Sequence, residues 1–268
     1  MTTELAGPSL STVPLTQRYS AADLRVFSAD EAGRFLAGTI ADPQRNPSLA
    51  WELLYRLEPD LYDRLVAAEH LHPGILEWLP PYVSRIIEVG AGTGRLTLEL
   101  IARCDQLTAV EPASPLRDRL RHKLASSPSP SGGGQGGRRV RVISGFFDAL
   151  PAPDRSAELV VACSALTPEA AHGGDRGLAE MERVCAAGGM VVIVWPNHPE
   201  WLIARGYQYL SFPGPMTMDF ASPTEAVDLV AIFYPQAVAE VQARAERQVS
   251  YDVVGVNPPR DLAYKNVP

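Results

Sequence analysis

The sequence predicts an α/β fold, a doubly wound and mostly parallel sheet with helices on both faces, preceded by an N-terminal helical segment. Before residue 83, apolar residues recur at helical spacing and no strand is indicated. After residue 83, short apolar runs alternate with amphipathic helical stretches, which is typical of parallel strands joined by helical crossovers. We therefore expect two domains: residues 1–82 as a helical cap or lid, and residues 83–268 as the sheet domain.

Composition narrows the class of protein. The 268 residues are 46% hydrophobic and 21% charged, enough apolar content for a buried core. The net charge of −7 argues against a nucleic-acid partner, because duplex-binding surfaces are usually basic. Cys104, Cys163 and Cys185 form neither a metal-binding spacing nor a disulfide framework, which indicates the reducing cytoplasm. We find no signal peptide and no apolar run long enough to cross a membrane.

Capping signals define the helices of the first segment. Residues 1 to about 17 are rich in Ser, Thr and Pro, and we expect them to be frayed. Ser28 and Glu31 match a capping box, and Pro59 and Pro73 stand where helices begin. The expected helices run from Glu31 to about Ile40, from a Ser48 cap through Leu57, from Pro59 through His70, and from Pro73 to Leu79.

Beyond residue 83 the strands and helices alternate. The expected strands are Arg85–Val89, Leu107–Val110, Arg139–Ile143, Glu158–Ala162, Met190–Trp195, Met216–Phe220 and Gln248–Val256. The expected helices are Leu96–Arg103, Leu116–Leu124, Asp175–Ala186 stopped by Gly188-Gly189, a helix capped by Ser222 that runs to Tyr234, and Pro235–Arg247. Residues 126–137 consist mainly of Ser, Gly and Pro and are expected to form a flexible loop.

The chain is organised around Arg85-Ile-Ile-Glu-Val-Gly-Ala-Gly-Thr-Gly-Arg95, where an apolar strand containing Glu88 breaks into three alternating glycines. Glycines let the backbone bend sharply and let a ligand approach closely. The following helix would offer free N–H groups to an anionic group. The spacing is not G-x-G-x-x-G, so a nicotinamide dehydrogenase is disfavoured. A tight turn without a ligand is the alternative interpretation.

This pattern, E-V-G-x-G-x-G, resembles motif I of the class I S-adenosylmethionine-dependent methyltransferases of the type 11-like, Rossmann-like group. The resemblance implies the strand order 3-2-1-4-5-7-6 with the last strand antiparallel, and S-adenosylmethionine as cofactor. Glu111 ends the second strand where the family has its ribose-binding acid. The residues implied to bind the cofactor around these two motifs are Glu88, Gly90, Ala91, Gly92, Gly94, Glu111 and Pro112.

The segment Ser144-Gly-Phe-Phe-Asp-Ala-Leu-Pro-Ala-Pro-Asp154 resembles the family's G-D-A-E-x-L-P-F-x-D segment, in which an acid accepts the adenine amino group. Here Phe146 occupies the usual aspartate position and the acid is Asp148. We expect Phe146 or Phe147 to pack on the adenine, with Asp148 or backbone carbonyls at the amino group; core packing is the alternative for the two phenylalanines. Cys163 is implied to be a small wall residue near the methyl group, and not a nucleophile.

Methyl transfer to a hydroxyl or an acidic carbon requires a base. His198 follows the fifth strand and His172 follows the fourth, and both are catalytic candidates, with His198 preferred. His70 and His72 of the helical segment are further candidates, and a surface or capping role is the alternative for each histidine. Asn257-Pro-Pro-Arg260 is interpreted as a turn that follows the last strand.

The sequence therefore predicts methyl transfer from S-adenosylmethionine to a small-molecule acceptor, with secondary metabolism as the suggested setting. A protein or RNA methyltransferase is one alternative, which a basic groove beside the pocket would favour. A non-catalytic cofactor-binding protein on the same fold is the other, because the acid after the third strand is displaced and no base is assured. We expect no membrane partner, and we keep a homodimer as an open expectation.

Overall fold

We examined the fold in a computed structural model, which describes residues 12–126 and 139–268. Contacts divide the chain into two compact units: residues 1–53 with 216–257, and residues 54–215 with 258–268. The expected domain boundary at residue 82 stays a prediction, because contact density is not a test of independent folding. The expected flexible loop lies outside the described residues from residue 127 onward, as does the expected frayed terminus up to residue 11.

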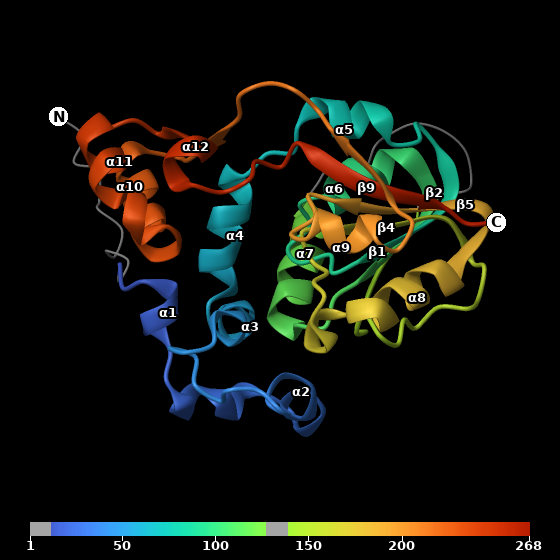
Figure 1. Cartoon of the computed structure of the whole chain (residues 1–268), viewed down its shortest axis with the longest axis horizontal. Helices are drawn as coiled ribbons and strands as arrows, with labels where there is room; N and C mark the ends of the chain where they lie inside the picture. Colours follow the sequence, from blue (N-terminus) through green and yellow to red (C-terminus); the bar gives the residue numbers. More distant parts are fainter. Residues whose placement is uncertain (1–11, 127–138) are drawn as a thin grey trace. The chain divides into compact units, whose positions relative to one another are not determined.

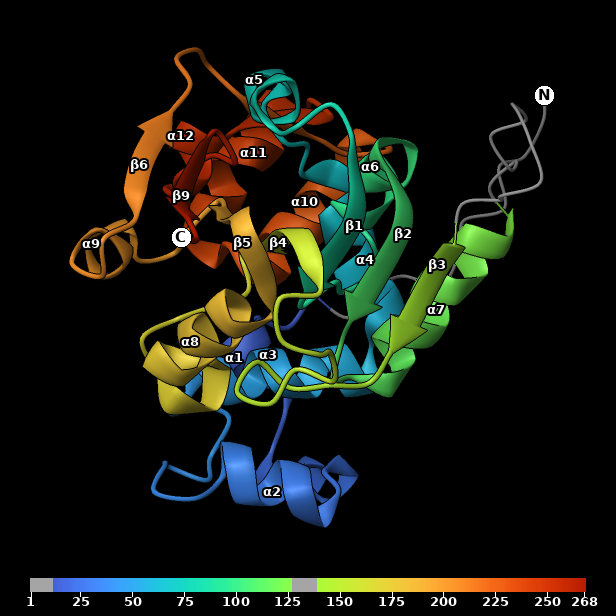
Figure 2. The same ribbon diagram turned by 90° about the vertical axis from the view of Figure 1, so that its right-hand side faces the viewer.

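The second unit contains a seven-stranded sheet in the order β3-β2-β1-β4-β5-β9-β6 (Figure 2). The strands β1 to β5 are parallel, and β9 runs antiparallel to both β5 and β6. This confirms the expected order. The strands are β1 (Val83–Val89), β2 (Cys104–Val110), β3 (Arg139–Ile143), β4 (Ala157–Cys163), β5 (Cys185–Val194), β6 (Gln208–Ser211) and β9 (Asp261–Asn266).

Two expected strands belong elsewhere, and this corrects the sequence interpretation. The segment 248–256 is not the last strand of the sheet: its first residues form β8 (Gln248–Ser250), and α12 (Tyr251–Val254) follows. The Ser250 side chain accepts from Asp252 N–H and caps that helix. β8 pairs instead with β7 (Thr217–Asp219), within the expected sixth strand, in a separate two-stranded sheet of the first unit. The turn at 257–260 therefore precedes the last strand.

The helices of the second unit surround its sheet (Figure 1). They are α4 (Pro59–Ala68), α5 (Pro73–Trp78), α6 (Thr97–Leu100), α7 (Ser114–Ser126), α8 (Gly174–Val184) and α9 (Pro199–Ile203), with 3₁₀ turns η2 (Ile101–Arg103) and η3 (Ala170–His172). The expected helix 96–103 is therefore one α turn followed by a 3₁₀ turn. The expected helix 175–186 ends at Val184 rather than at the glycine pair, because Cys185 already begins β5 and the glycines lie inside that strand.

The first unit packs N-terminal helices with residues 216–257. Its elements are α1 (Leu15–Arg18), η1 (Ala21–Val26), α2 (Ala29–Phe35), α3 (Pro47–Leu57, which continues into the second unit), α10 (Pro223–Phe233), η4 (Pro235–Ala237), α11 (Val238–Arg244), β7, β8 and α12. Trp51 of α3 stacks on Phe233 of α10, with ring centroids 5.5 Å apart. The expected caps Ser28 and Ser222 are confirmed. Ser48 lies inside α3, and Asn46 accepts from Leu49 N–H in its place.

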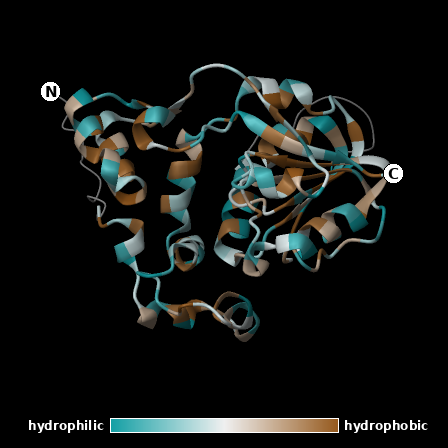
Figure 3. Ribbon diagram, in the orientation of Figure 1, coloured by the Kyte–Doolittle hydropathy of each residue, from teal (hydrophilic) through white to brown (hydrophobic). Residues whose placement is uncertain are grey.

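The side chains of the main sheet alternate between two apolar layers. On one face, α8 and α9 pack against alternate strand residues, among them Ile87, Val160 and Ile193. On the other face, α5 and α6 pack against Ile86, Val161 and their neighbours. Figure 3 shows these strands as predominantly hydrophobic. In the described ranges, no helix is both long enough and apolar enough to span a bilayer.

Arg183 of α8 fixes the connection between β3 and β4. Its Nη1 donates to Ala152 O at 3.0 Å and contacts Asp154 Oδ1 at 2.6 Å. Its Nη2 donates to Leu150 O at 3.1 Å, and Glu180 accepts from both Nε and Nη2. One planar guanidinium thus satisfies two loop carbonyls and two carboxylates, which suits its fixed fork of donors. The loop that contains Phe146 to Asp148 is anchored through this contact.

We expect Arg183→Ala to lower the free energy of unfolding by about 1–2 kcal/mol, because the loop carbonyls lose charged donors and the guanidinium is already 32% exposed. Urea denaturation followed by circular dichroism measures the change. Arg176→Ala on the same helix is the control, since this side chain is 77% exposed and only approaches Asp148 at 4.0 Å. Equal stability of the two variants would contradict the anchoring role.

Candidate functional site

The glycine turn follows β1 and adopts a backbone that favours glycine. Gly90, Gly92 and Gly94 have φ angles of +72°, +55° and +101°. The N–H groups of Gly90 and Ala91 donate to Val110 O at 2.8 and 3.1 Å, which joins the turn to the end of β2. A Cβ on Gly90 would lie 2.7 Å from the Cβ of Ala165, so space also requires glycine there. The turn lies where the strand order reverses, the usual ligand position in open α/β sheets.

Glu111 ties the same turn to the segment after β2. This carboxylate is only 5% exposed. Its Oε2 accepts from Gly92 N–H at 2.9 Å, and its Oε1 accepts from Ala113 N–H at 2.8 Å. Arg117 donates to the carbonyl oxygens of Glu111 and Pro112 at 2.7 and 2.6 Å. The structure therefore brings the glycine turn, Glu111 and Pro112 together, as the resemblance implies, while their cofactor contacts stay predictions.

Glu88 lies beneath the turn and is almost completely buried, at 1% exposure. Its Oε2 accepts from the hydroxyl of Thr97 in α6 at 2.5 Å. Burial raises the pKa of Glu88 to about 8, opposed by the hydrogen bond from Thr97 and reinforced by the nearby charge of Glu111. At neutral pH this carboxyl is therefore largely protonated.

Tyr62 of α4 lies over the glycine turn. A Cβ on Gly92 would be 3.5 Å from the Tyr62 hydroxyl, and the Tyr55 ring contacts Tyr62 edge-on with centroids 4.8 Å apart. Burial is the main cause that raises the pKa of Tyr62. The charge of Arg95 opposes this shift, and that of Glu69 adds to it. From the sequence, Tyr62 is one of several apolar residues of the N-terminal helices that suit either core packing or the lining of a substrate pocket, and its helical spacing does not distinguish the two.

A buried ion pair borders the same region. Arg95, which directly follows the glycine turn, contacts Glu69 at the end of α4. The side chains of Arg95 and Glu69 are only 14% and 4% exposed. The guanidinium carbon of Arg95 also lies 4.9 Å from the ring centroid of Trp195, after β5. Sequence reasoning missed this pair, since no local pattern relates residue 69 to residue 95.

The ends of β4 and β5 carry two non-glycine residues with left-handed backbones, Ser164 and Trp195, each with φ of +49°. Ser164 N–H donates to Val194 O at 2.9 Å, and Trp195 N–H donates to Asp261 O at 2.8 Å. These contacts hold a conformation that non-glycine residues seldom adopt and that occurs often at functional sites. They position Trp195 against Arg95.

Cys163 ends β4 beside the same charged groups. Burial raises the pKa of its thiol to about 12; Arg95 opposes this shift, whereas Glu88 and Glu69 add to it. The thiol is therefore neutral at physiological pH, and a neutral thiol is a weak nucleophile. This agrees with the expected wall position, which stays a prediction.

The segment after β3 reaches the turn through Phe147. A Cβ on Gly90 would lie 3.1 Å from the Phe147 ring, and one on Gly173 would lie 3.1 Å from its Cβ. The carbonyl of Phe146 accepts from Ala149 N–H at 3.2 Å in a tight turn. Asp148 faces α8, with its Oδ2 4.0 Å from Arg176 Nη1. The structure thus brings Phe147 to the glycine turn, whereas Asp148 approaches an arginine.

Two of the candidate histidines, His172 and His72, have local partners. The Nδ1 of His172 lies 3.3 Å from Glu169 Oε2. His198 is exposed at the N-terminus of α9. His72 Nδ1 accepts from Gly74 N–H at 3.0 Å, and its ring stacks on Phe212, so this residue caps α5. The catalytic roles of His198 and His172 stay predictions.

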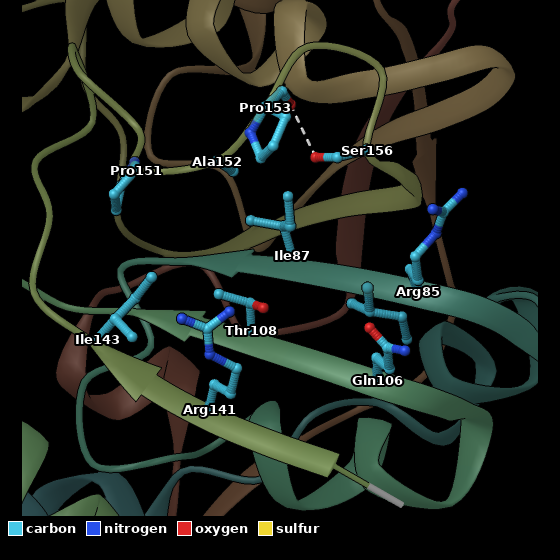
Figure 4. Close-up of a pocket in the computed structure, with 11 residues that line it drawn as sticks. Arg85, Ile87, Gln106, Thr108, Arg141, Ile143, Pro151, Ala152, Pro153 and Ser156 are labelled. Carbon is cyan, nitrogen blue, oxygen red and sulfur yellow. Dashed lines mark hydrogen bonds between the residues drawn. The ribbon is translucent and has the colours of Figure 1, made fainter.

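A separate hollow of about 240 Å³ lies over β1, β2 and β3, on the sheet face that carries α8 (Figure 4). The chain from residue 151 to 156 runs along its other side, where Ser156 Oγ donates to Pro153 O at 2.8 Å. It is lined by Arg85, Ile86, Ile87, Gln106, Thr108, Arg141, Ile143, Pro151, Ala152, Pro153 and Ser156. None of the expected site residues lines this hollow, so we place the candidate site at the glycine turn.

The raised pKa of Glu88 predicts a pH dependence of stability. The folded protein holds a proton that the unfolded chain loses above pH 4.5, so the stabilisation is complete below that value and is lost as the pH rises through about 8. We expect the free energy of unfolding to fall by up to about 1.4 kcal/mol per pH unit within this window, relative to Glu88→Gln. Urea denaturation at several pH values measures both proteins, and parallel profiles would contradict the shift.

Comparison with known proteins identifies the region that holds this site. Residues 86–189 match a family model described as a methyltransferase domain. An uncharacterised methyltransferase of Mycobacterium tuberculosis is 30% identical over 133 residues, which cover 48% of this chain and 47% of that protein. The rice (Oryza sativa subsp. japonica) chloroplastic 2-methyl-6-phytyl-1,4-hydroquinone methyltransferase 1 is 25% identical over 155 residues, 56% of this chain and 40% of that protein.

The chain spans less than half of the length of either curated relative. Among solved structures, the YcgJ protein of Bacillus subtilis aligns with a TM-score of 0.45 at 11% identity, over 72% of this chain and 95% of that one. The family model covers the glycine turn, Glu111, Phe147 and Cys163 within one continuous match. Residues 86–189 are thus similar to a methyltransferase domain, and this match supports S-adenosylmethionine as the cofactor of the region.

Proposed function

We propose that this protein transfers a methyl group from S-adenosylmethionine to a small organic acceptor. The observation that carries the proposal is the buried carboxylate of Glu111, which accepts from Gly92 N–H at the switch point of the sheet. A carboxylate has about four lone-pair sites. Gly92 N–H and Ala113 N–H each donate to one of its oxygens, which fixes the carboxylate beside the turn where a ribose diol would bind.

The residues present fit this cofactor. The turn at 90–94 contains three glycines, which let a ligand approach its backbone closely, and Glu111 supplies an acceptor beside it. In the proposed assignment Glu88, Gly90, Ala91, Gly92 and Gly94 hold the amino-acid end, Glu111 and Pro112 the sugar, Phe146, Phe147 and Asp148 the adenine, and Cys163 borders the methyl group. When bound, the cofactor supplies an electrophilic methyl group on a sulfonium.

The chain's own residues then have the task of alignment and water exclusion, which lower the barrier to methyl transfer. Tyr62 and Tyr55 contribute aromatic surface on the side of α4, and Trp195 contributes it at the end of β5. Aromatic faces suit a positively charged sulfonium. His198 and His172 remain the proposed candidates for a base, should the acceptor be a hydroxyl or an acidic carbon.

Aromatic walls also support a small organic acceptor. The rice relative is named for a hydroquinone, which is compatible with an aromatic acceptor here. We propose further that the protein acts in the cytoplasm, in secondary metabolism, with residues 1–82 as a cap. α4 supports the cap assignment because it brings Tyr62 to the glycine turn within the second unit.

The proposal is tested by measuring the affinity of purified protein for S-adenosylmethionine and S-adenosylhomocysteine by calorimetry. We expect Glu111→Ala to weaken both ligands by about 10–100-fold, since hydrogen bonds to a charged group contribute about 1.5–3 kcal/mol. Glu158→Ala is the control, because this carboxylate pairs with Arg85 near the separate hollow. Unchanged affinity of Glu111→Ala, or no binding by the unaltered protein, would refute the assignment.

A further inference from the structure

We propose that the Glu69–Arg95 pair recognises the zwitterionic amino-acid end of the cofactor, with Arg95 directed to its carboxylate and Glu69 to its ammonium. The inference rests on the proposed function and deepens it, because it assigns two residues that motif I does not contain. It also makes the end of α4 part of the cofactor site.

The position of the pair supports this role. Arg95 directly follows Gly94, so its backbone continues from the turn that the cofactor approaches. Glu69 follows α4, and Tyr62 of the same helix lies over Gly92. The pair therefore borders the glycine turn from two independent segments of the second unit.

Stability alone does not account for the pair. The two side chains are 14% and 4% exposed, so both charges are largely removed from water. Desolvation of two such charges offsets most of their mutual attraction, and apolar replacements of buried pairs are often neutral or stabilising. A buried pair that borders the glycine turn therefore calls for a function that uses its charges.

The chemistry of the pair matches that of the ligand. An α-amino acid carries a carboxylate and an ammonium on one carbon, and the protein offers a guanidinium and a carboxylate side by side. The planar guanidinium of Arg95 has five donors in a fixed fork, a geometry that suits carboxylates. The Trp195 ring, 4.9 Å from the guanidinium carbon, supports its orientation.

Glu88 is the competing partner for the ammonium. Its carboxyl already accepts from Thr97, and its raised pKa leaves it largely neutral near pH 7. Glu69 instead forms an ion pair with Arg95. A charged acceptor binds a cation more strongly than a neutral one, and this favours Glu69.

Three ligands separate the parts of the cofactor. S-Adenosylmethionine carries the whole amino-acid end, decarboxylated S-adenosylmethionine lacks only the carboxylate, and 5′-methylthioadenosine lacks both charged groups. Calorimetry of each ligand with the full chain, Arg95→Gln, Glu69→Gln and the double variant measures the contribution of each charge. The double variant leaves no unpaired buried charge, so it guards against loss of folding. Circular dichroism checks that each variant is folded.

We expect Arg95→Gln to weaken S-adenosylmethionine by about 10–100-fold, and to change the affinity for 5′-methylthioadenosine less than about twofold. The preference for S-adenosylmethionine over its decarboxylated form should disappear in this variant. Glu69→Gln should weaken both ligands that retain the ammonium, again without affecting 5′-methylthioadenosine. The double variant should bind all three ligands with similar affinity.

Arg85→Gln is the matched control, because Arg85 forms an ion pair with Glu158 beside the separate hollow; all three affinities should remain unchanged. Equal weakening of all three ligands by Arg95→Gln would show that the pair only maintains the turn, and would overturn the inference. Unchanged binding of S-adenosylmethionine would overturn it as well. Failure of the unaltered protein to bind any ligand would instead refute the proposed function itself.

Discussion

The hydrogen bonds of Glu111 are the constraint on which the candidate site depends. A single buried carboxylate accepts from the glycine turn after β1 and from the start of the helical segment after β2. Without it, two loops from adjacent strands would have to satisfy their buried N–H groups separately, and such groups are costly to leave unpaired. One side chain therefore organises the turn at which we propose that the cofactor binds.

Much of the sheet follows from the sequence because parallel strands are buried on both faces. β3 was predicted with its observed bounds, and the strand order implied by the resemblance is confirmed. The last strands were not predicted correctly. The short apolar runs at 217–219 and 248–250 satisfy the strand pattern equally well, but local periodicity does not say which sheet a strand joins. Only tertiary contact separates β8 from β9.

The residues of the candidate site likewise fall into those that the sequence predicts and those that only the structure brings together. Glu88, the three glycines and Glu111 belong to local motifs, and the structure gathers them around one turn. Tyr62, Glu69 and Trp195 come from distant segments whose residue types are ordinary for a helix or a strand end, so no pattern distinguishes them. Asp148 lies two residues after the position of the family's acid and 4.0 Å from Arg176 of α8, and its contact with the adenine stays a prediction.

The position of β9 has a consequence for how the protein is assembled. β6 is an edge strand whose pairing partner is β9, yet the chain between them passes through the first unit before it returns. β6 therefore cannot form its hydrogen bonds with β9 until residues 216–257, and then β9 itself, have been synthesised. Long-range pairing of this kind slows folding. The edge of the sheet is thus completed only after the C-terminal part of the first unit, residues 216–257, has left the ribosome.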